Sequence, residues 1–380
     1  MNEATPQGSQ DAAPHWPHVA PEAAGFDPAK LADAVAFARA NETEWPRDMY
    51  VDGTFIASVH VGDKPPYDRP MGPVVPRGPT NGLILRGGAL VAEWGDTRRP
   101  EMTFSVAKSY LAILAGLAVD DGLLPSLDRP VRETVGDDLF ADPHNRPITW
   151  RHLLQQTSEW RGTLFERPDS VDWNRQVGMD APDPAEPEKG TERSLQAPGT
   201  HFEYNDVRVN LLGLCLLRLF KEPLPSVLKR RIMDPAGCSR DWSWHGYDTS
   251  WVEIDGRRMQ SVPGGGHWGG GIVIGARDHA RVGEVVLANG MWQGRRLLSP
   301  EWIAAMLTPS PAHAGYGLLW WLNTGRALFP AAPETSVFAL GGGTTCIWID
   351  APRELVAVVR WLHKPALDKL MRRITNAINT

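Results

Sequence analysis

The sequence has few cysteines and no excess of charge strong enough to define a partner. Its three cysteines, Cys215, Cys238 and Cys346, lie far apart and form no C-x-x-C pair, which argues against a disulfide framework or a structural zinc site. Lysine and arginine total 39 against 45 acidic residues, so the net charge is -6, and no basic run is present. We therefore expect a small-molecule partner and exclude a nucleic acid or an anionic membrane.

Long apolar runs are also missing. Residues 1–18, MNEATPQGSQDAAPHWPH, have neither the basic start nor the apolar stretch of a secretory signal. No segment approaches the roughly 20 apolar residues that span a bilayer. These absences predict a cytoplasmic protein, and the polar, proline-rich composition of residues 1–20 predicts a disordered start.

Motifs of several enzyme classes are absent. There is no G-x-S-x-G elbow, which excludes an α/β-hydrolase, and His201, His245 and His267 lack H-E-x-x-H or another ligand spacing. The string GGGHWG at 264–269 matches G-x-G-x-x-G, but it follows a loop instead of a strand. A glycine-rich turn is the better interpretation, and we expect no metal and no cofactor.

The rest of the sequence alternates between segments with the pattern of a strand and segments with the pattern of a helix. A capped amphipathic helix is expected at 27–40, a buried helix at 104–119 and a further helix at 206–220. Two β-prone runs joined by a glycine turn predict a hairpin at 81–94, and two runs rich in β-branched residues predict another at 344–362. The sequence therefore predicts an α+β fold, an antiparallel sheet flanked by helices with a large helical insertion.

This layout divides the chain into two domains. Residues 21–109 and 270–380 are expected to form the sheet domain, and residues 110–269 a mainly helical domain. We expect the active site at the interface between them.

Two polar side chains stand at the start of the apolar run 104–119. Ser105 and Lys108 are three residues apart, so both project from one helix face one turn apart. Burial disfavours a charged ammonium, and a neutral amine beside a hydroxyl can act as a general base. The first helical turn also favours the negative charge that develops in acyl transfer. An isolated S-x-x-K is more often a capping serine followed by a snorkelling lysine than a catalytic pair, so its context decides.

Five segments supply that context in order along the chain. They resemble the motifs of the serine β-lactamase, DD-peptidase and family VIII esterase group. The segments are TFSVAKSYLAILAGLAVDDG (103–122), ITWRHLLQQTSEW (148–160), PGTHFEYNDVRVNLLG (198–213), GGGIVIGARDHARVG (269–283) and YGLLWW (316–321). In the second segment Glu159 stands where glycine is usual. The resemblance implies a β-lactamase/transpeptidase-like fold.

The resemblance also implies roles for individual residues. It makes Ser105 the acylated nucleophile, Lys108 its base and Tyr204 the phenol that shuttles a proton. The family's Y-S-N becomes Tyr204-Asn205-Asp206, which places a carboxylate near the lysine. The predicted function is a serine hydrolase that cleaves an ester or a short amide through an acyl-serine intermediate.

The third family motif departs further from the pattern. ALGGGTTCIWID (339–350) is similar to the A-x-G-x-G-G-Q of 6-aminohexanoate-dimer hydrolases, with Gly342 where lysine or histidine would stand. The backbone of Thr344 or Thr345 is expected to complete an oxyanion hole with that of Ser105. The residues expected to bind substrate are Trp160, Asp206, Trp268, Trp320, Gly342 and Gly343.

Three alternatives remain open. A β-lactamase or DD-peptidase, or an acyltransferase, would use the same acyl-enzyme. A catalytically silent binding module on the same fold is disfavoured by the intact Ser105, Lys108 and Tyr204.

Overall fold

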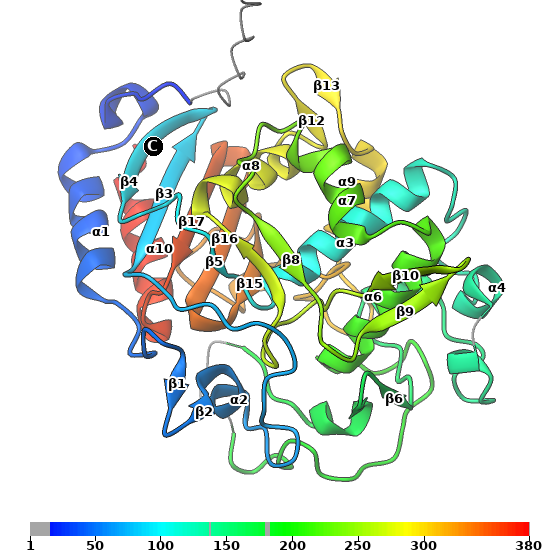
Figure 1. Cartoon of the computed structure of the whole chain (residues 1–380). Coiled ribbons are helices and arrows are strands. Elements are labelled where there is room, and N and C mark those ends of the chain that lie inside the picture. Colours follow the sequence, from blue (N-terminus) through cyan, green and yellow to red (C-terminus); the bar gives the residue numbers. More distant parts are fainter. Residues whose placement is uncertain (1–15, 137, 179–182, 380) are drawn as a thin grey trace, which may run out of the picture.

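A six-stranded antiparallel sheet forms the centre of the computed structural model, which describes residues 16–136, 138–178 and 183–379 (Figure 1). The strand order is β14–β15–β16–β17–β3–β4. The strands are β3 (Asn81–Arg86), β4 (Ala89–Trp94), β14 (Trp321–Leu322), β15 (Ser336–Gly341), β16 (Thr345–Asp350) and β17 (Leu355–Arg360). Because β3 pairs with β17, early and late parts of the chain share one sheet.

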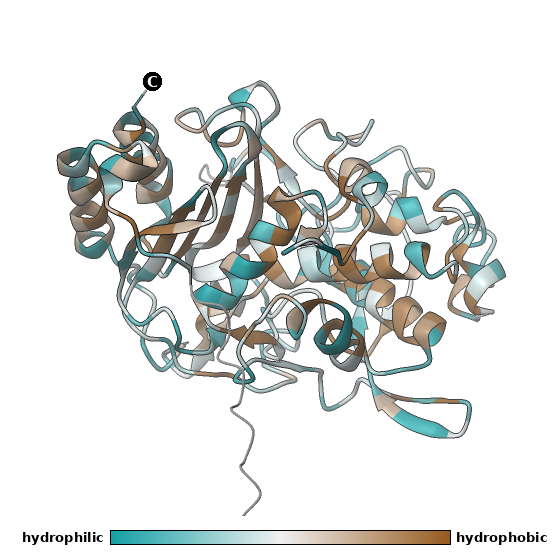
Figure 2. Cartoon of the chain, turned by 90° about the horizontal axis from the view of Figure 1, so that it is seen from above, coloured by the Kyte–Doolittle hydropathy of each residue, from teal (hydrophilic) through white to brown (hydrophobic). Residues whose placement is uncertain are grey.

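Helices cover both faces of this sheet. The helices α1 (Pro28–Ala40) and α10 (Leu367–Ala377) pack on each other at one side of the sheet (Figure 2). On the other side, α8 (Ala276–Leu287) contacts β3, β16 and β17, and α3 (Val106–Asp120) contacts β15 and β16. Every residue of β16 and β17 is buried, as their continuous apolar runs indicate.

The chain between β4 and β14 builds the second half of the molecule around α3. This helix packs against α6 (Asp206–Phe220), α7 (Leu224–Leu228) and α9 (Pro300–Met306). A second sheet has the order β5–β11–β8. Its strands are β5 (Glu101–Met102), β8 (Ser243–His245) and β11 (Gly271–Ile274).

Short elements complete the fold. The helical ones are η1 (Pro21–Ala24), α2 (Ile56–Val61), α4 (Val131–Val135), η2 (Asp138–Phe140), α5 (Trp150–Leu154), η3 (Asp169–Asp172), the π-helical turn η4 (Lys229–Met233), η5 (Thr324–Arg326), η6 (Gly342–Thr344), η7 (Ala351–Arg353) and η8 (Lys364–Ala366). The strands are β1 (Tyr50–Val51), β2 (Thr54–Phe55), β6 (Thr163–Leu164), β7 (Arg167–Pro168), β9 (Trp251–Ile254), β10 (Arg257–Gln260), β12 (Met291–Trp292) and β13 (Arg295–Arg296). None of the helices in the described ranges has the length and apolar character needed to cross a bilayer.

The expected helices and hairpins are present with small shifts of their ends. The Asp27 side chain caps α1 by accepting from the backbone of Ala29 and Lys30. Strands β3 and β4 join at Gly87 and Gly88, both of which have positive φ, as a tight hairpin turn requires. Within the predicted helical region, the hairpins β6–β7 and β9–β10 accompany the helices. The division into two domains stays a prediction.

The start of the described chain differs from the expectation of disorder. Trp16 is buried and its Nε1 donates to Glu284 on α8 at 2.5 Å. The backbone of Leu90 on β4 also bonds to Pro17 and Val19. The prediction of disorder is therefore wrong for residues 16–20, because this segment adds backbone bonds and an indole to the sheet domain. Residues 1–15 lie outside the described residues.

Candidate active site

Ser105 and Lys108 meet at the start of α3. Ser105 is the N-cap of this helix, and Lys108, one turn later, is only 1% exposed. The Nζ of Lys108 lies 3.0 Å from the Oγ of Ser105, within hydrogen-bond distance. Residues 106–118 of the helix are all buried, so a charged ammonium there requires a partner of opposite charge.

Asp206, the first residue of α6, supplies that partner. One carboxylate oxygen, Oδ1, pairs with Lys108, and the other, Oδ2, receives Arg175 at 3.0 Å and His267 Nδ1 at 2.5 Å. Burial opposes ionisation, but the attraction of the basic groups that contact it, Lys108, Arg175 and His267, holds the pKa of the Asp206 carboxyl well below its usual range. Asp206 is buried and is outside the cavity lining, so it contacts the lysine and not the space for substrate.

Tyr204 lies beside this pair, two residues before α6. Its ring stacks on Trp321 with centroids 5.7 Å apart. Two cations lie over the same ring, Lys108 Nζ at 4.6 Å and Arg175 Cζ at 5.2 Å from its centroid. Within the described ranges no hydrogen bond joins the Tyr204 hydroxyl to Ser105 or Lys108. The ring is thus held next to the lysine, and its role as a proton shuttle stays a prediction.

The end of β15 passes directly against Ser105. A Cβ atom on Gly341 would lie 3.3 Å from the backbone nitrogen of Ser105, so the two backbones nearly touch. The chain then turns through Gly343 and Thr344, which have φ of 63° and 60°, and Thr345 pairs back with Gly341. This turn is where a second oxyanion donor was expected, and the choice between Thr344 and Thr345 stays a prediction.

A cavity of about 1020 Å³ opens at Ser105. That volume is at the upper end of the range of small-molecule sites. Its lining includes Trp45, His60, Phe104, Ser105, Arg175, Lys189, Tyr204, His267, Trp321, Leu340, residues 341–345, Lys364 and Leu367. The nucleophile, the tyrosine and the turn after β15 therefore face one common space.

The tryptophans expected to bind substrate lie elsewhere. Trp160, Trp268 and Trp320 are at most 1% exposed and are not part of the cavity lining. The indole of Trp160 donates to Leu139 O and that of Trp268 to Tyr67 O, both at 2.8 Å, so these rings hold loops together. Two other tryptophans, Trp45 and Trp321, line the cavity together with the expected Gly342 and Gly343.

Asp206 belongs to a buried group that the sequence did not reveal. We call it the charge cluster, and its side chains are at most 9% exposed: Asp63, Lys108, Asp172, Arg175, Lys189, Asp206 and His267. Lys189 pairs with Asp63 and, at 3.1 Å, with Asp172, while Arg175 reaches Asp172 at 3.5 Å. Asp63, Asp172 and His267 place oxygen and nitrogen atoms within 4.8 Å of one another, and Lys189 supplies the cation between these carboxylates.

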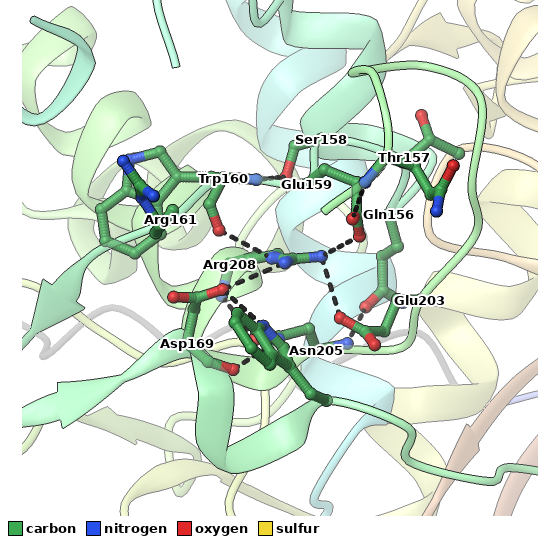
Figure 3. A network of polar contacts seen from close by, with 12 residues as sticks. Gln156, Thr157, Ser158, Glu159, Trp160, Arg161, Asp169, Glu203, Asn205 and Arg208 are labelled. Carbon is green, nitrogen blue, oxygen red and sulfur yellow. Dashed lines mark hydrogen bonds and ion pairs between the residues drawn. The ribbon is translucent and has the colours of Figure 1, made fainter. Parts of the chain in front are cut away.

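Glu159 stands where the family pattern usually has glycine, and its side chain is held by ion pairs. Its φ of 50° lies in the left-handed region, which accounts for the glycine that is usual there. The carboxylate binds Arg193 at 2.6 Å. It also binds Arg208 at 2.8 Å, and Arg208 reaches Asp169 at 3.0 Å (Figure 3). Burial raises the pKa of Glu159, but the two arginines outweigh it and bring the pKa to about 2. This network fixes the loop before β6 against α6, the helix that carries Asp206.

Comparisons with known proteins identify relatives of this fold. Residues 85–372 match the family model described as Beta-lactamase. Among curated proteins, Protein Rv1367c of Mycobacterium tuberculosis (strain ATCC 25618 / H37Rv) is 25% identical over an alignment of 232 residues, and the match covers 54% of this chain and 58% of that protein. The match thus spans less than two thirds of the length of the curated relative.

Two solved structures cover nearly the whole chain. A penicillin-binding protein homologue from Caulobacter crescentus has a TM-score of 0.59 at 15% identity, covering 93% of this chain and 99% of that one. A Bacillus anthracis protein, named for a proposed 6-aminohexanoate-dimer hydrolase activity, has a TM-score of 0.58 at 14% identity, covering 97% and 87%. At these identities the likeness shows the fold, which is the β-lactamase/transpeptidase-like α+β arrangement predicted from the sequence.

Proposed function

Because the chain belongs to the β-lactamase family, we propose that it is a serine hydrolase that cleaves an ester or a short amide through an acyl-enzyme on Ser105. One observation carries the proposal. The Oγ of Ser105 lies 3.0 Å from the Nζ of Lys108, at a helix N-terminus that opens into the cavity. This is the geometry that an activated serine nucleophile requires.

In the first half-reaction the Ser105 oxygen attacks the acyl carbonyl, and its proton passes to the amine of Lys108. The carbonyl oxygen becomes an oxyanion, for which the backbone N–H of Ser105 and that of Thr345 or Thr344 are the proposed donors. The leaving alcohol or amine departs with a proton delivered through Tyr204 or Lys108. In the second half-reaction water attacks the acyl-serine, gives one proton to the same base, and the acid leaves as Ser105 regains its hydrogen.

The residues around Gly342 favour neutral substrates over β-lactams. A β-lactam carries a carboxylate that family members bind with a cation at this position, whereas Gly342 packs against Trp45 and Phe104. Arg277 is not a substitute, because its guanidinium binds Glu93 with distances of 2.5 and 2.7 Å. Arg175, Lys189 and Lys364 line the cavity, and the first two are ion-paired with carboxylates of the charge cluster. These contacts support an ester or linear amide as the substrate.

Covalent labelling tests the proposal. We expect a fluorophosphonate to add one adduct to the wild type by intact-mass measurement, and none to Ser105→Ala with unchanged thermal stability. Peptide mapping should place the adduct on Ser105. An adduct on another serine, or none on a folded wild type under conditions that label a known serine hydrolase, would contradict the proposed function.

A further inference from the structure

The charge cluster behind Ser105 contains one more basic group than it has carboxylates. Three carboxylates, Asp63, Asp172 and Asp206, face Lys108, Arg175, Lys189 and His267. Burial opposes ionisation of Asp172, but Lys189, Arg175 and His267 lower its pKa. Burial likewise disfavours the charged form of Arg175, but Asp206 and Asp172 outweigh it and raise its pKa. Asp172 and Asp206 are therefore anionic and Arg175 stays cationic.

One further proton then neutralises the cluster. Arg175 and the paired Lys189 balance two of the three carboxylates, which leaves one negative charge. Two bases can carry the balancing proton, and both contact Asp206: Lys108 at Oδ1 and His267 at Oδ2. Because an uncompensated charge is costly at this depth, protonating both bases or neither is disfavoured.

The surroundings of His267 favour it over Lys108 as the base that carries the balancing proton. Its Nδ1 lies 2.5 Å from Asp206, and its Nε2 lies 3.4 Å from Asp63 Oδ2. An imidazolium would face a carboxylate on each side, although Nε2 and Asp63 Oδ2 lie close without forming a hydrogen bond, whereas a neutral ring would turn a lone pair toward one of the carboxylates. Asp172, Arg175 and Lys189 are further charged groups around it. Trp268 packs on the ring with centroids 3.9 Å apart, and Arg167 lies over the Trp268 ring and interacts with Asp63.

The backbone of the turn 264–269 fixes this position. A Cβ atom on Gly265 would lie 2.8 Å from Asp206 Oδ2, so the glycine allows the turn to pass close to the carboxylate. Ser58 donates to the carbonyl oxygen of His267 at 2.9 Å and anchors the turn to α2.

We propose that His267 is a positioning residue that holds the single balancing proton of the charge cluster, so that Lys108 is a neutral amine when it deprotonates Ser105. The exchange moves one N–H bond from Lys108 to His267 and leaves the net charge of the cluster unchanged. The inference rests on the proposed function, because it explains how a lysine ion-paired to Asp206 can serve as the base. It assigns a task to His267 that the family's serine, lysine and tyrosine do not perform.

The pH dependence of kcat/KM for a nitrophenyl ester tests this exchange. In His267→Gln only Lys108 can carry the proton, so we expect kcat/KM at pH 7 to fall at least about tenfold. The acid limb should move up by about one pH unit or more, since each unit corresponds to a tenfold change. The double variant Asp206→Asn/His267→Gln removes one negative charge as well, and its acid limb should return toward that of the wild type.

His279→Gln is the matched control. His279 is equally buried but bonds Thr103 and Tyr110 outside the charge cluster, so its replacement should leave the acid limb in place. A wild-type acid limb in folded His267→Gln would overturn the inference, as would a double variant whose limb stays with that of the single one. Labelling of Ser105 in the same variants separates this failure from a failure of the proposed function.

Nitrogen-15 NMR of histidine-labelled wild type gives a test that needs no variant. At pH 8, where an exposed histidine is neutral, one histidine should carry hydrogen on both ring nitrogens. That signal should be absent from His267→Gln if this variant folds. If all histidines of the wild type are neutral at pH 8, the inference is wrong.

Discussion

A Cβ atom on Gly341 would lie 3.3 Å from the backbone nitrogen of Ser105 and 2.2 Å from the carbonyl oxygen of Thr103. The second distance is too short for any real contact between these atoms, and the obstacle is backbone, which cannot rotate away. The close approach of β15 to the nucleophile therefore depends on a residue without a side chain.

Gly341→Ala should push β15 away from the start of α3. We expect kcat for an ester to fall at least about tenfold, because the oxyanion donors after β15 would no longer be aimed at the carbonyl. Gly342→Ala is the matched control, since the nearest atoms to its Cβ would belong to the side chains of Trp45 and Phe104, at 3.1 and 3.2 Å, and not to the backbone. Steady-state kinetics and thermal melts of both variants test this. Equal kcat values in the two variants would contradict it.

Lys108→Ala and Tyr204→Phe should each lower kcat by about a hundredfold or more, the usual weight of a positioned acid or base. The fold should survive in both variants, because Tyr204→Phe keeps the ring that stacks on Trp321. Binding of a non-hydrolysable substrate analogue should stay within a few-fold of the wild type. Normal turnover in Tyr204→Phe would show that the proton reaches the leaving group by another path.

Neutral esters should be hydrolysed far better than cephalosporins. A charge-assisted hydrogen bond to the β-lactam carboxylate contributes roughly 1.5 to 3 kcal/mol, so its absence costs on the order of ten- to a hundredfold in kcat/KM. The measurement compares kcat/KM for a short-chain nitrophenyl ester and a chromogenic cephalosporin. A preference for the cephalosporin would show that Gly342 does not set the specificity, and would favour a β-lactamase or DD-peptidase.

The ionised Glu159 side chain should stabilise the fold, so the free energy of unfolding should fall when this group is protonated at low pH. Its folded-state pKa is about 2, below the ordinary value of 4.5, so its contribution is fully present above pH 4.5 and is lost as the pH falls toward 2. We expect Glu159→Gln to be destabilised at pH 7, and its difference from the wild type to shrink between pH 4.5 and 2. Denaturant melts across this range provide the measurement. A difference that does not change with pH would show that the ion pairs with Arg193 and Arg208 contribute little.

Local patterns in the sequence predict much of the fold and the central pair of residues. The helix of Ser105 and Lys108 is a continuous apolar run, and α6 has the predicted bounds Asp206–Phe220. In contrast, α10 was not expected. Its buried residues Leu367, Leu370, Met371 and Ile374 recur at helical spacing and pack on α1, so the sequence does carry the local signal of an amphipathic helix there.

The charge cluster could not be predicted, because its members come from segments far apart in the sequence. Asp63 follows α2, Lys189 lies in a loop, and His267 sits in a string whose glycines indicated only a turn. The one available signal was Asp206 at an asparagine position, since a buried carboxylate requires counterions from somewhere in the fold. The tryptophans gave a misleading signal, because residue type alone does not separate a ring that fills the interior from one that lines a cavity.

The pairing of β3 with β17 has a consequence for the protein during its synthesis. Leu83 faces Val358 in this ladder, so the ribosome must add about 275 residues between the two halves of the pair. Until β17 emerges, the apolar strands β3 and β4 have a free edge, and the nucleophile's helix has no complete sheet to pack on. A nascent chain halted before residue 355 should therefore hold Ser105, Lys108 and Tyr204 and still be inactive, sensitive to protease and dependent on chaperones.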